Sequence, residues 1–134
     1  MATITDQKLA ITHDHTKKTA RCFVTAKLNF DPLERFLMQQ GLRFKLKCEL
    51  WGDDSGLTGS DDKLFTYTPV KYFPDRTPTP TEDVTFDVTL GEGVLDEDGF
   101  LGGYVDEVYG KLTLNNLYTL VTVTKNTNVI AHRF

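Results

Sequence analysis

The feature that most constrains the fold is a strict alternation of apolar and charged side chains along residues 42–50. Every second residue from Leu42 to Leu50 is apolar, and the residues between them are charged. A period of two is typical of a β-strand that has one face in a core and the other in water. Weaker versions of the same alternation occur over residues 20–30, 84–90 and 108–114. The sequence therefore predicts an all-β chain.

About seven such segments follow one another with short turns between them, which is typical of an antiparallel β-sandwich with Greek-key connections. Residues 64–73 are expected to form an edge strand, because Pro69 interrupts them. Asn115 and Asn116 tolerate a tight hairpin turn, so residues 117–124 and 129–134 are expected to be the last two strands.

One short helix, about residues 32–40, is predicted between two strands. Asp31 offers an N-cap oxygen, Pro32 suits the first helical position, and Glu34 supplies the carboxylate of a capping box. Gly41 is a helix stop signal.

The length of 134 residues predicts one domain over residues 1–134. Residues 1–18 are expected to be either a loosely ordered arm or an edge strand. No apolar run approaches the length of a bilayer span, and no secretory signal is visible, so a cytoplasmic location is expected, with a removed leader as the alternative. Cys22 and Cys48 are predicted to be two buried free thiols or, in an exported protein, one disulfide.

The net charge of −4 is unevenly distributed along the chain. Residues 51–110 hold fourteen acidic and three basic side chains, which gives this part a charge of −11. An acidic surface repels phosphate backbones, so no nucleic-acid partner is expected. Such a surface attracts a cation or a basic protein partner instead.

Two acidic, glycine-containing segments have the chemistry of a calcium site, because calcium takes six to eight oxygen ligands from carboxylates and carbonyls. The segments are DDSGLTGSDDKLFTY from residue 53 and DEDGFLGGYVDEVYGKLTL from residue 96. They resemble two loops of the calcium-dependent phospholipid-binding sandwich called the C-two domain. The resemblance implies a β-sandwich that binds calcium through Asp54, Asp61, Asp96, Asp98 and Asp106. The alternative is that both segments are ordinary solvated turns.

The run DEVYGKLTLNN also resembles the aspartate and tyrosine corner of immunoglobulin-like sandwiches. This competing resemblance implies the same architecture without a calcium site.

Four apolar or aromatic side chains are candidates for a partner surface. Phe100, Leu101 and Tyr104 lie in the glycine-rich part of the second acidic segment, and Trp51 precedes the first. Apolar side chains beside a cation site suit contact with a protein or with a membrane surface, the latter if calcium binds.

A second metal candidate is His13-x-His15, whose imidazoles lie on one side of an extended strand. His132 near the other end of the chain completes three ligands for a zinc or nickel ion. The alternative is a pair of exposed polar side chains near a terminus.

The function expected from these features is a non-enzymatic binding or assembly module, with calcium as the expected cofactor if there is one. A protein partner or self-association is expected. One alternative is a structural, oligomer-forming sandwich without metal. The other is a small hydrolase that uses two of the acidic residues, although the chain has no nucleophile motif.

Overall fold

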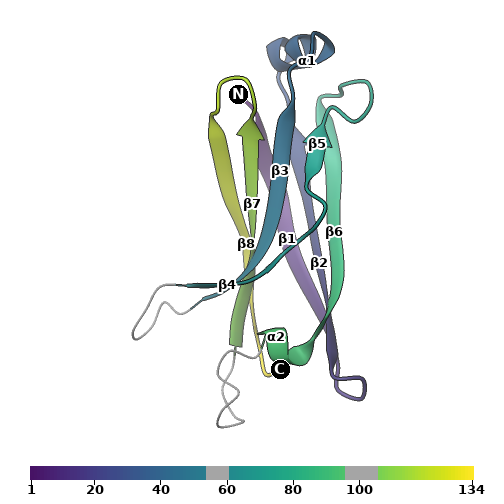
Figure 1. The fold of residues 1–134 in the computed structure, drawn as a ribbon, viewed down its shortest axis with the longest axis vertical. Helices are drawn as coiled ribbons and strands as arrows, with labels where there is room; N and C mark the ends of the chain where they lie inside the picture. The colour runs from purple at the N-terminus through teal and green to yellow at the C-terminus, as the bar shows by residue number, and fades with distance from the viewer. Residues whose placement is uncertain (54–60, 96–105) are drawn as a thin grey trace.

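The structure is a computed structural model that describes residues 1–53, 61–95 and 106–134. Within these residues, eight strands form two antiparallel sheets that pack against each other as two layers (Figure 1). The fold is therefore the all-β antiparallel sandwich that the alternation predicts.

The first sheet has three strands in the order β1-β2-β6. They are β1 (Thr3–Asp14), β2 (Thr19–Asn29) and β6 (Thr81–Gly91). β1 lies at the edge of this sheet and covers most of residues 1–18, for which either a loosely ordered arm or an edge strand was expected.

The second sheet has the order β4-β3-β7-β8, and β5 also pairs with β3. Its strands are β3 (Phe44–Gly52), β4 (Asp62–Thr66), β5 (Lys71–Phe73), β7 (Asp106–Asn116) and β8 (Thr122–His132). The strand predicted over residues 64–73 is two short strands, β4 and β5, both on the same side of β3. Its predicted edge position is confirmed.

The prediction for the last part of the chain is wrong in two respects. Asn115 and Asn116, expected to form the hairpin turn, are the last residues of β7, and the turn is formed by residues 117–121, part of a predicted strand. β8 then runs without a break through residues 125–128, which were expected to be a second turn. The polar residues there favour a turn locally, but pairing with β7 keeps them extended, with a register shift between Tyr109 and Lys111.

Helix α1 (Pro32–Gln39) connects β2 to β3 and confirms the predicted helix. The Asp31 carboxylate accepts the N–H of Glu34 at 2.7 Å, and the Glu34 carboxylate accepts the N–H of Asp31 at 2.9 Å. This is the predicted capping box. A second, four-residue helix, α2 (Glu92–Leu95), directly follows β6 and was not predicted.

The core lies between the two sheets and is formed by the alternate apolar residues of their strands. Val24 and Leu28 of β2 and Leu46 and Leu50 of β3 belong to this core, and all four are fully buried. Cys22 and Cys48 are also buried, each on a different sheet, and both are free thiols. The prediction of two buried free thiols is therefore confirmed.

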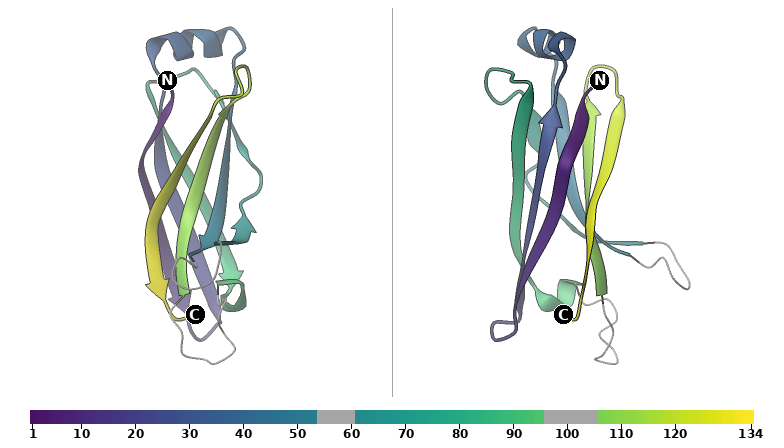
Figure 2. Two further views of the ribbon diagram at one scale, coloured as in Figure 1. Left: turned by 90° about the vertical axis from the view of Figure 1, so that its left-hand side faces the viewer. Right: turned by 180° about the vertical axis from the view of Figure 1, so that it is seen from behind.

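The two sheets meet along a seam between β1 and β8, which are edge strands of different sheets. The side chain of Asn128 on β8 bridges this seam. Its Oδ1 accepts the N–H of Leu9 at 2.8 Å, and its Nδ2 donates to the Leu9 carbonyl at 3.1 Å. Both strands run from the end that carries α1 toward the end that carries α2 (Figures 1 and 2).

Among the described residues, neither helix has the length and apolar character that crossing a bilayer requires.

Candidate metal centre

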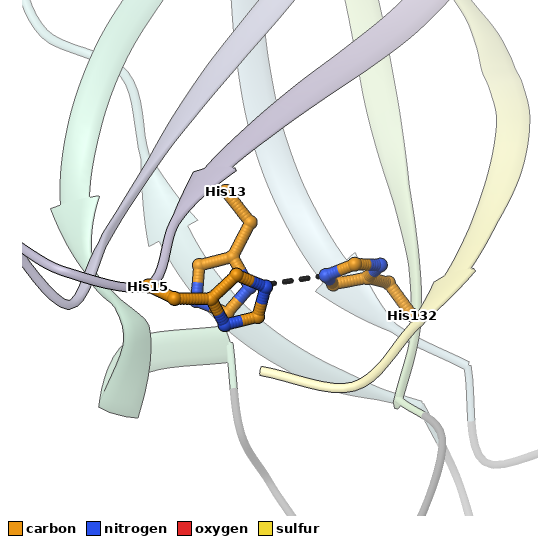
Figure 3. Close-up of side chains that lie close together, drawn as sticks. All are labelled: His13, His15 and His132. Atoms are coloured by element: carbon orange, nitrogen blue, oxygen red, sulfur yellow. Dashed lines mark hydrogen bonds between the residues drawn. The ribbon is translucent and has the colours of Figure 1, made fainter.

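All three histidines of the chain meet at one end of the seam (Figure 3). His13 lies near the end of β1, His15 begins the turn that follows, and His132 ends β8. One possible ligand nitrogen from each ring lies within 4.8 Å of the other two. The structure therefore brings together the three side chains that the sequence offers as a zinc or nickel site.

The strand periodicity explains why the rings converge. On β1, Leu9 and Ile11 face the core, and His13 continues the same face two residues later. On β8, Ile130 packs against the core and His132 continues its face. Because β1 and β8 run in the same direction along the seam, the two faces end at the same place.

His13 is contacted through both of its ring nitrogens. Its Nδ1 lies 3.0 Å from Nε2 of His132, and its Nε2 lies 2.8 Å from Oε2 of Glu92. An ionised carboxylate only accepts hydrogen bonds, so Nε2 of His13 carries the proton that it donates to Glu92. Nδ1 of His13 then presents a lone pair toward His132, which is the arrangement that a metal ligand needs.

Glu92 is held in place by the backbone around it. It is the first residue of α2, and its N–H donates to the carbonyl of Lys18 at 2.9 Å. Lys18 belongs to the turn between β1 and β2, which also contains His15. This hydrogen bond places the start of α2 beside the turn that holds His15.

The centre is buried on one side and open on the other. The side chain of His13 is 4% exposed, whereas His15 is exposed. The ring of Phe134 packs beside His13 and His132, with centroid distances of 5.3 and 4.8 Å. Burial lowers the pKa of His132, and repulsion between its protonated form and protonated His13 or His15 lowers it further. A lowered pKa favours the neutral imidazole, the form that binds metal ions.

The arrangement fits a transition-metal ion. In a tetrahedral zinc site the Zn–N distance is about 2.0–2.1 Å, which places ligand nitrogens roughly 3.3 Å apart. The pair formed by His13 and His132 is already near this separation at 3.0 Å, and no pair is farther apart than 4.8 Å. Each pair of these nitrogens is therefore within about 1.5 Å of the spacing that one shared ion requires.

The predicted calcium ligands are only partly within the described residues. Asp54, Asp96 and Asp98 lie outside them. Asp61 lies directly before β4, and its carboxylate accepts the hydroxyl proton of Tyr109 at 2.7 Å. Asp106 is buried at the start of β7 and is paired in register with His132. One predicted calcium ligand is thus a strand neighbour of the histidine cluster.

The predicted partner surface lies mostly outside the described residues as well, because Phe100, Leu101 and Tyr104 fall in the segment 96–105. Trp51 is described and is half-buried at the end of β3. Its indole N–H donates to Glu49 at 3.4 Å, and the Lys111 ammonium lies 5.0 Å from the centre of its ring.

Glu92 is the residue of the centre that the sequence did not reveal. The Gly91-Glu92-Gly93 run indicates the end of a strand and carries no sign of a partner. Pairing of Thr19 with Gly91 places the end of β6 beside the turn that holds His15. Only this long-range register, which no local pattern encodes, shows that the carboxylate reaches His13.

No protein-family model matches the chain, and no curated protein matches it. Among solved structures, a target of the Northeast Structural Genomics Consortium is similar with a TM-score of 0.42 and 10% identity, over 98% of this chain and 84% of that one. A Bordetella pertussis protein described as ApaA is similar with a TM-score of 0.40 and 7% identity, over 100% of this chain and 92% of that one. β-Glucosidase 3B from Thermotoga neapolitana is similar over 17% of its length, with a TM-score of 0.37 and 8% identity. Similarities at this level carry no argument about function.

Proposed function

We propose that this protein is a non-enzymatic binding module whose sandwich holds a divalent transition-metal ion, zinc above all, through His13, His15 and His132. The observation that carries the proposal is the convergence of the three imidazoles, with Glu92 on the far nitrogen of His13. Metal-binding histidines almost always donate their second N–H to a carboxylate, a carbonyl or water. Histidines that bind no metal do not require a carboxylate on the second ring nitrogen.

The donor atoms decide which ions suit the centre. Imidazole nitrogen suits zinc, copper and nickel, whereas calcium and magnesium take oxygen ligands. The calcium site expected in the acidic segments is therefore a separate prediction, and it stays a prediction here.

An ion bound at this centre joins the two sheets. His13 belongs to the edge strand of one sheet and His132 to the edge strand of the other. The ion therefore acts as a cross-link at the end of the seam, beyond the bridge formed by Asn128. We infer that the metal stabilises the sandwich at the end of the seam where β1 and β8 finish.

Calorimetric titration of the chelator-treated protein with zinc tests the proposal. We expect one ion per chain. Loss of a partner carboxylate alone typically lowers affinity 10–100-fold, so His13→Ala and His132→Ala are expected to lower it at least that much. Thr12→Ala is the matched control, because Thr12 is exposed on the opposite side of the same strand. Zinc binding that is absent, or that survives both histidine substitutions, contradicts the proposal.

The same titration with calcium tests the separate prediction for the acidic segments. If calcium binds, Asp61→Asn and Asp106→Asn lower its affinity, and phospholipid vesicles are the next partner to try. If no heat of calcium binding is measured up to millimolar concentration, the acidic segments are solvated turns.

A second candidate function, self-association, is favoured by the orientation of α1. Its apolar side chains Leu33 and Phe36 face outward and are 65% and 57% exposed, while Met38 is buried. Tyr118 and Leu120 of the β7–β8 turn lie at the same end of the molecule and are 78% and 72% exposed. Exposed apolar groups gathered at one end are typical of a contact surface.

Light scattering over a range of concentrations tests self-association. We expect a dimer that Phe36→Ser converts to a monomer, whereas Thr12→Ala at the other end leaves it intact. A wild-type protein that is monomeric at all concentrations rules this function out.

A further inference from the structure

The histidine centre, if it holds a metal as proposed above, has too few protein ligands among the described residues to fill a tetrahedron. Those residues supply three imidazole nitrogens. Glu92 contacts the cluster, and its Oε2 accepts from Nε2 of His13 at 2.8 Å. The two nitrogens of an imidazole point in different directions, so a carboxylate bound at Nε2 is directed away from an ion on Nδ1.

Zinc sites with three protein ligands keep the fourth position for water or for an external ligand, whereas structural sites are closed by four protein ligands. The open side of this centre is the side of His15, which is exposed in the turn after β1. An external ligand can therefore approach the ion without any movement of the two sheets.

We infer that the metal-loaded centre keeps one open coordination position and that this position takes a small carboxylate. This inference rests on the proposed metal site and adds the class of its ligand. The exchange is simple: a carboxylate oxygen donates a lone pair to the ion, and the bound water leaves. No bond within the carboxylate is made or broken.

An incoming anion meets positive charge from the ion and from the turn beside it. A divalent ion held by three neutral imidazoles brings two positive charges, which Glu92 and the buried Asp106 beside His132 offset within the protein. Lys17 and Lys18 follow His15 in the exposed turn and add positive charge on the open side. Asp14 opposes them in part, although its carboxylate accepts the N–H groups of Thr16 and Lys17, each at 3.0 Å.

The wall of the centre favours a carboxylate that carries an apolar group. The Phe134 ring packs against His13 and His132 and is half-buried, so part of the ring remains open beside the cluster. The ring of an aromatic carboxylate packs against the Phe134 ring, whereas acetate has no apolar group large enough for this contact. Burial of apolar surface equal to about one methylene corresponds to roughly a fourfold gain in affinity.

The test uses cobalt in place of zinc, because the visible absorption of bound cobalt depends on the number and kind of its ligands. The cobalt-loaded chain is titrated with acetate, benzoate and azide while its spectrum is recorded. We expect a saturable change with each anion and a dissociation constant for benzoate that is about fourfold lower than that for acetate. In Phe134→Ala we expect this preference to disappear while acetate still binds.

The possible results separate this inference from the proposed function. If cobalt does not bind, or binds equally well to His132→Ala, both are wrong. If cobalt binds to the histidines and the spectrum does not respond to any of the anions, the metal site is correct but a fourth protein ligand closes it, and the open position is wrong. If acetate and benzoate bind equally well, the position is open but the Phe134 wall has no role in selection, and the aromatic preference is wrong.

Discussion

His13 is the residue on which the candidate centre depends most. Its ring is almost fully buried and has a partner on each nitrogen. These contacts determine both the position of the ring and its tautomer. His15 is exposed, and His132 is contacted mainly by aromatic rings. We therefore expect changes around His13 to affect metal binding more than changes around the other two histidines.

Glu92→Gln tests the role of the carboxylate. Glutamine keeps the shape of the side chain but has no charge to attract the N–H of His13, so the lone pair on Nδ1 is held less firmly. We expect the zinc dissociation constant to rise about 10–100-fold in calorimetry. Glu107→Gln is the control, because Glu107 is an exposed glutamate at the same end of the molecule. Equal effects of the two substitutions contradict the assigned role of Glu92.

The two thiols are expected to be unreactive in the folded protein. Burial raises the pKa of Cys22 to about 11, and it raises the pKa of Cys48 as well. Because the thiolate is the nucleophile, a disulfide reagent at pH 8 is expected to react with neither thiol until denaturant is added. Gln40→Cys provides an exposed thiol at the end of α1 as a positive control. Rapid reaction of the native wild-type protein is the contrary result.

At the scale of the element, the start of α1 is predicted by local sequence, whereas its orientation is not. Its capping residues are adjacent in the chain, so Asp31, Pro32 and Glu34 predict its start correctly. The side that it turns to the core depends on packing against distant strands. Only Met38 among its apolar residues is buried.

Met38→Ala and Phe36→Ala form a matched pair that tests this orientation. Removing the buried Met38 side chain leaves a cavity, and we expect the free energy of unfolding to fall by about 2–5 kcal/mol. Phe36 is 57% exposed, so its removal is expected to change that free energy by about 0.5 kcal/mol or less at low protein concentration. Urea denaturation measures both. A large loss with Phe36→Ala shows that the outer side of α1 is buried in solution.

The strands show the same division between local and distant information. β2, β3 and β6 alternate between apolar and polar side chains, because each has one face in the core, and all three were predicted. β8 is mostly exposed and has no such alternation, so its composition was interpreted as a turn between two strands. Pairing with β7 and the contact of Asn128 with Leu9 supply the hydrogen bonds that keep it extended.

At the scale of the whole molecule, the seam between β1 and β8 connects the fold to the candidate site. Asn128 completes hydrogen bonds of the Leu9 backbone that the strands themselves do not make. We expect Asn128→Ala to lower the free energy of unfolding by about 1–2 kcal/mol, as measured in urea, because two hydrogen bonds are lost. Asn128→Asp keeps the acceptor and loses the donor. Its free energy of unfolding is expected to lie between those of the wild type and of Asn128→Ala. No change in either variant shows that the bridge does not stabilise the seam.

Metal binding at the end of this seam is expected to raise the unfolding temperature. Zinc at a hundredfold excess over its dissociation constant stabilises the folded state by about 2.7 kcal/mol, which corresponds to roughly 10 °C for a chain of this size. A chelator reverses the rise, and His132→Ala abolishes it. A midpoint that zinc does not change contradicts binding to the folded state.

The length of β1 has a practical consequence for studies of this molecule. β1 spans twelve residues, and at a rise of about 3.3 Å per residue it is roughly 40 Å long. The histidines lie at one end of it and α1 at the other. A paramagnetic ion in the centre therefore broadens the magnetic resonance signals of a residue according to its position along the strands. Residues near α2 therefore lose their signals and residues near α1 keep them. The same measurement shows at which end a second chain binds.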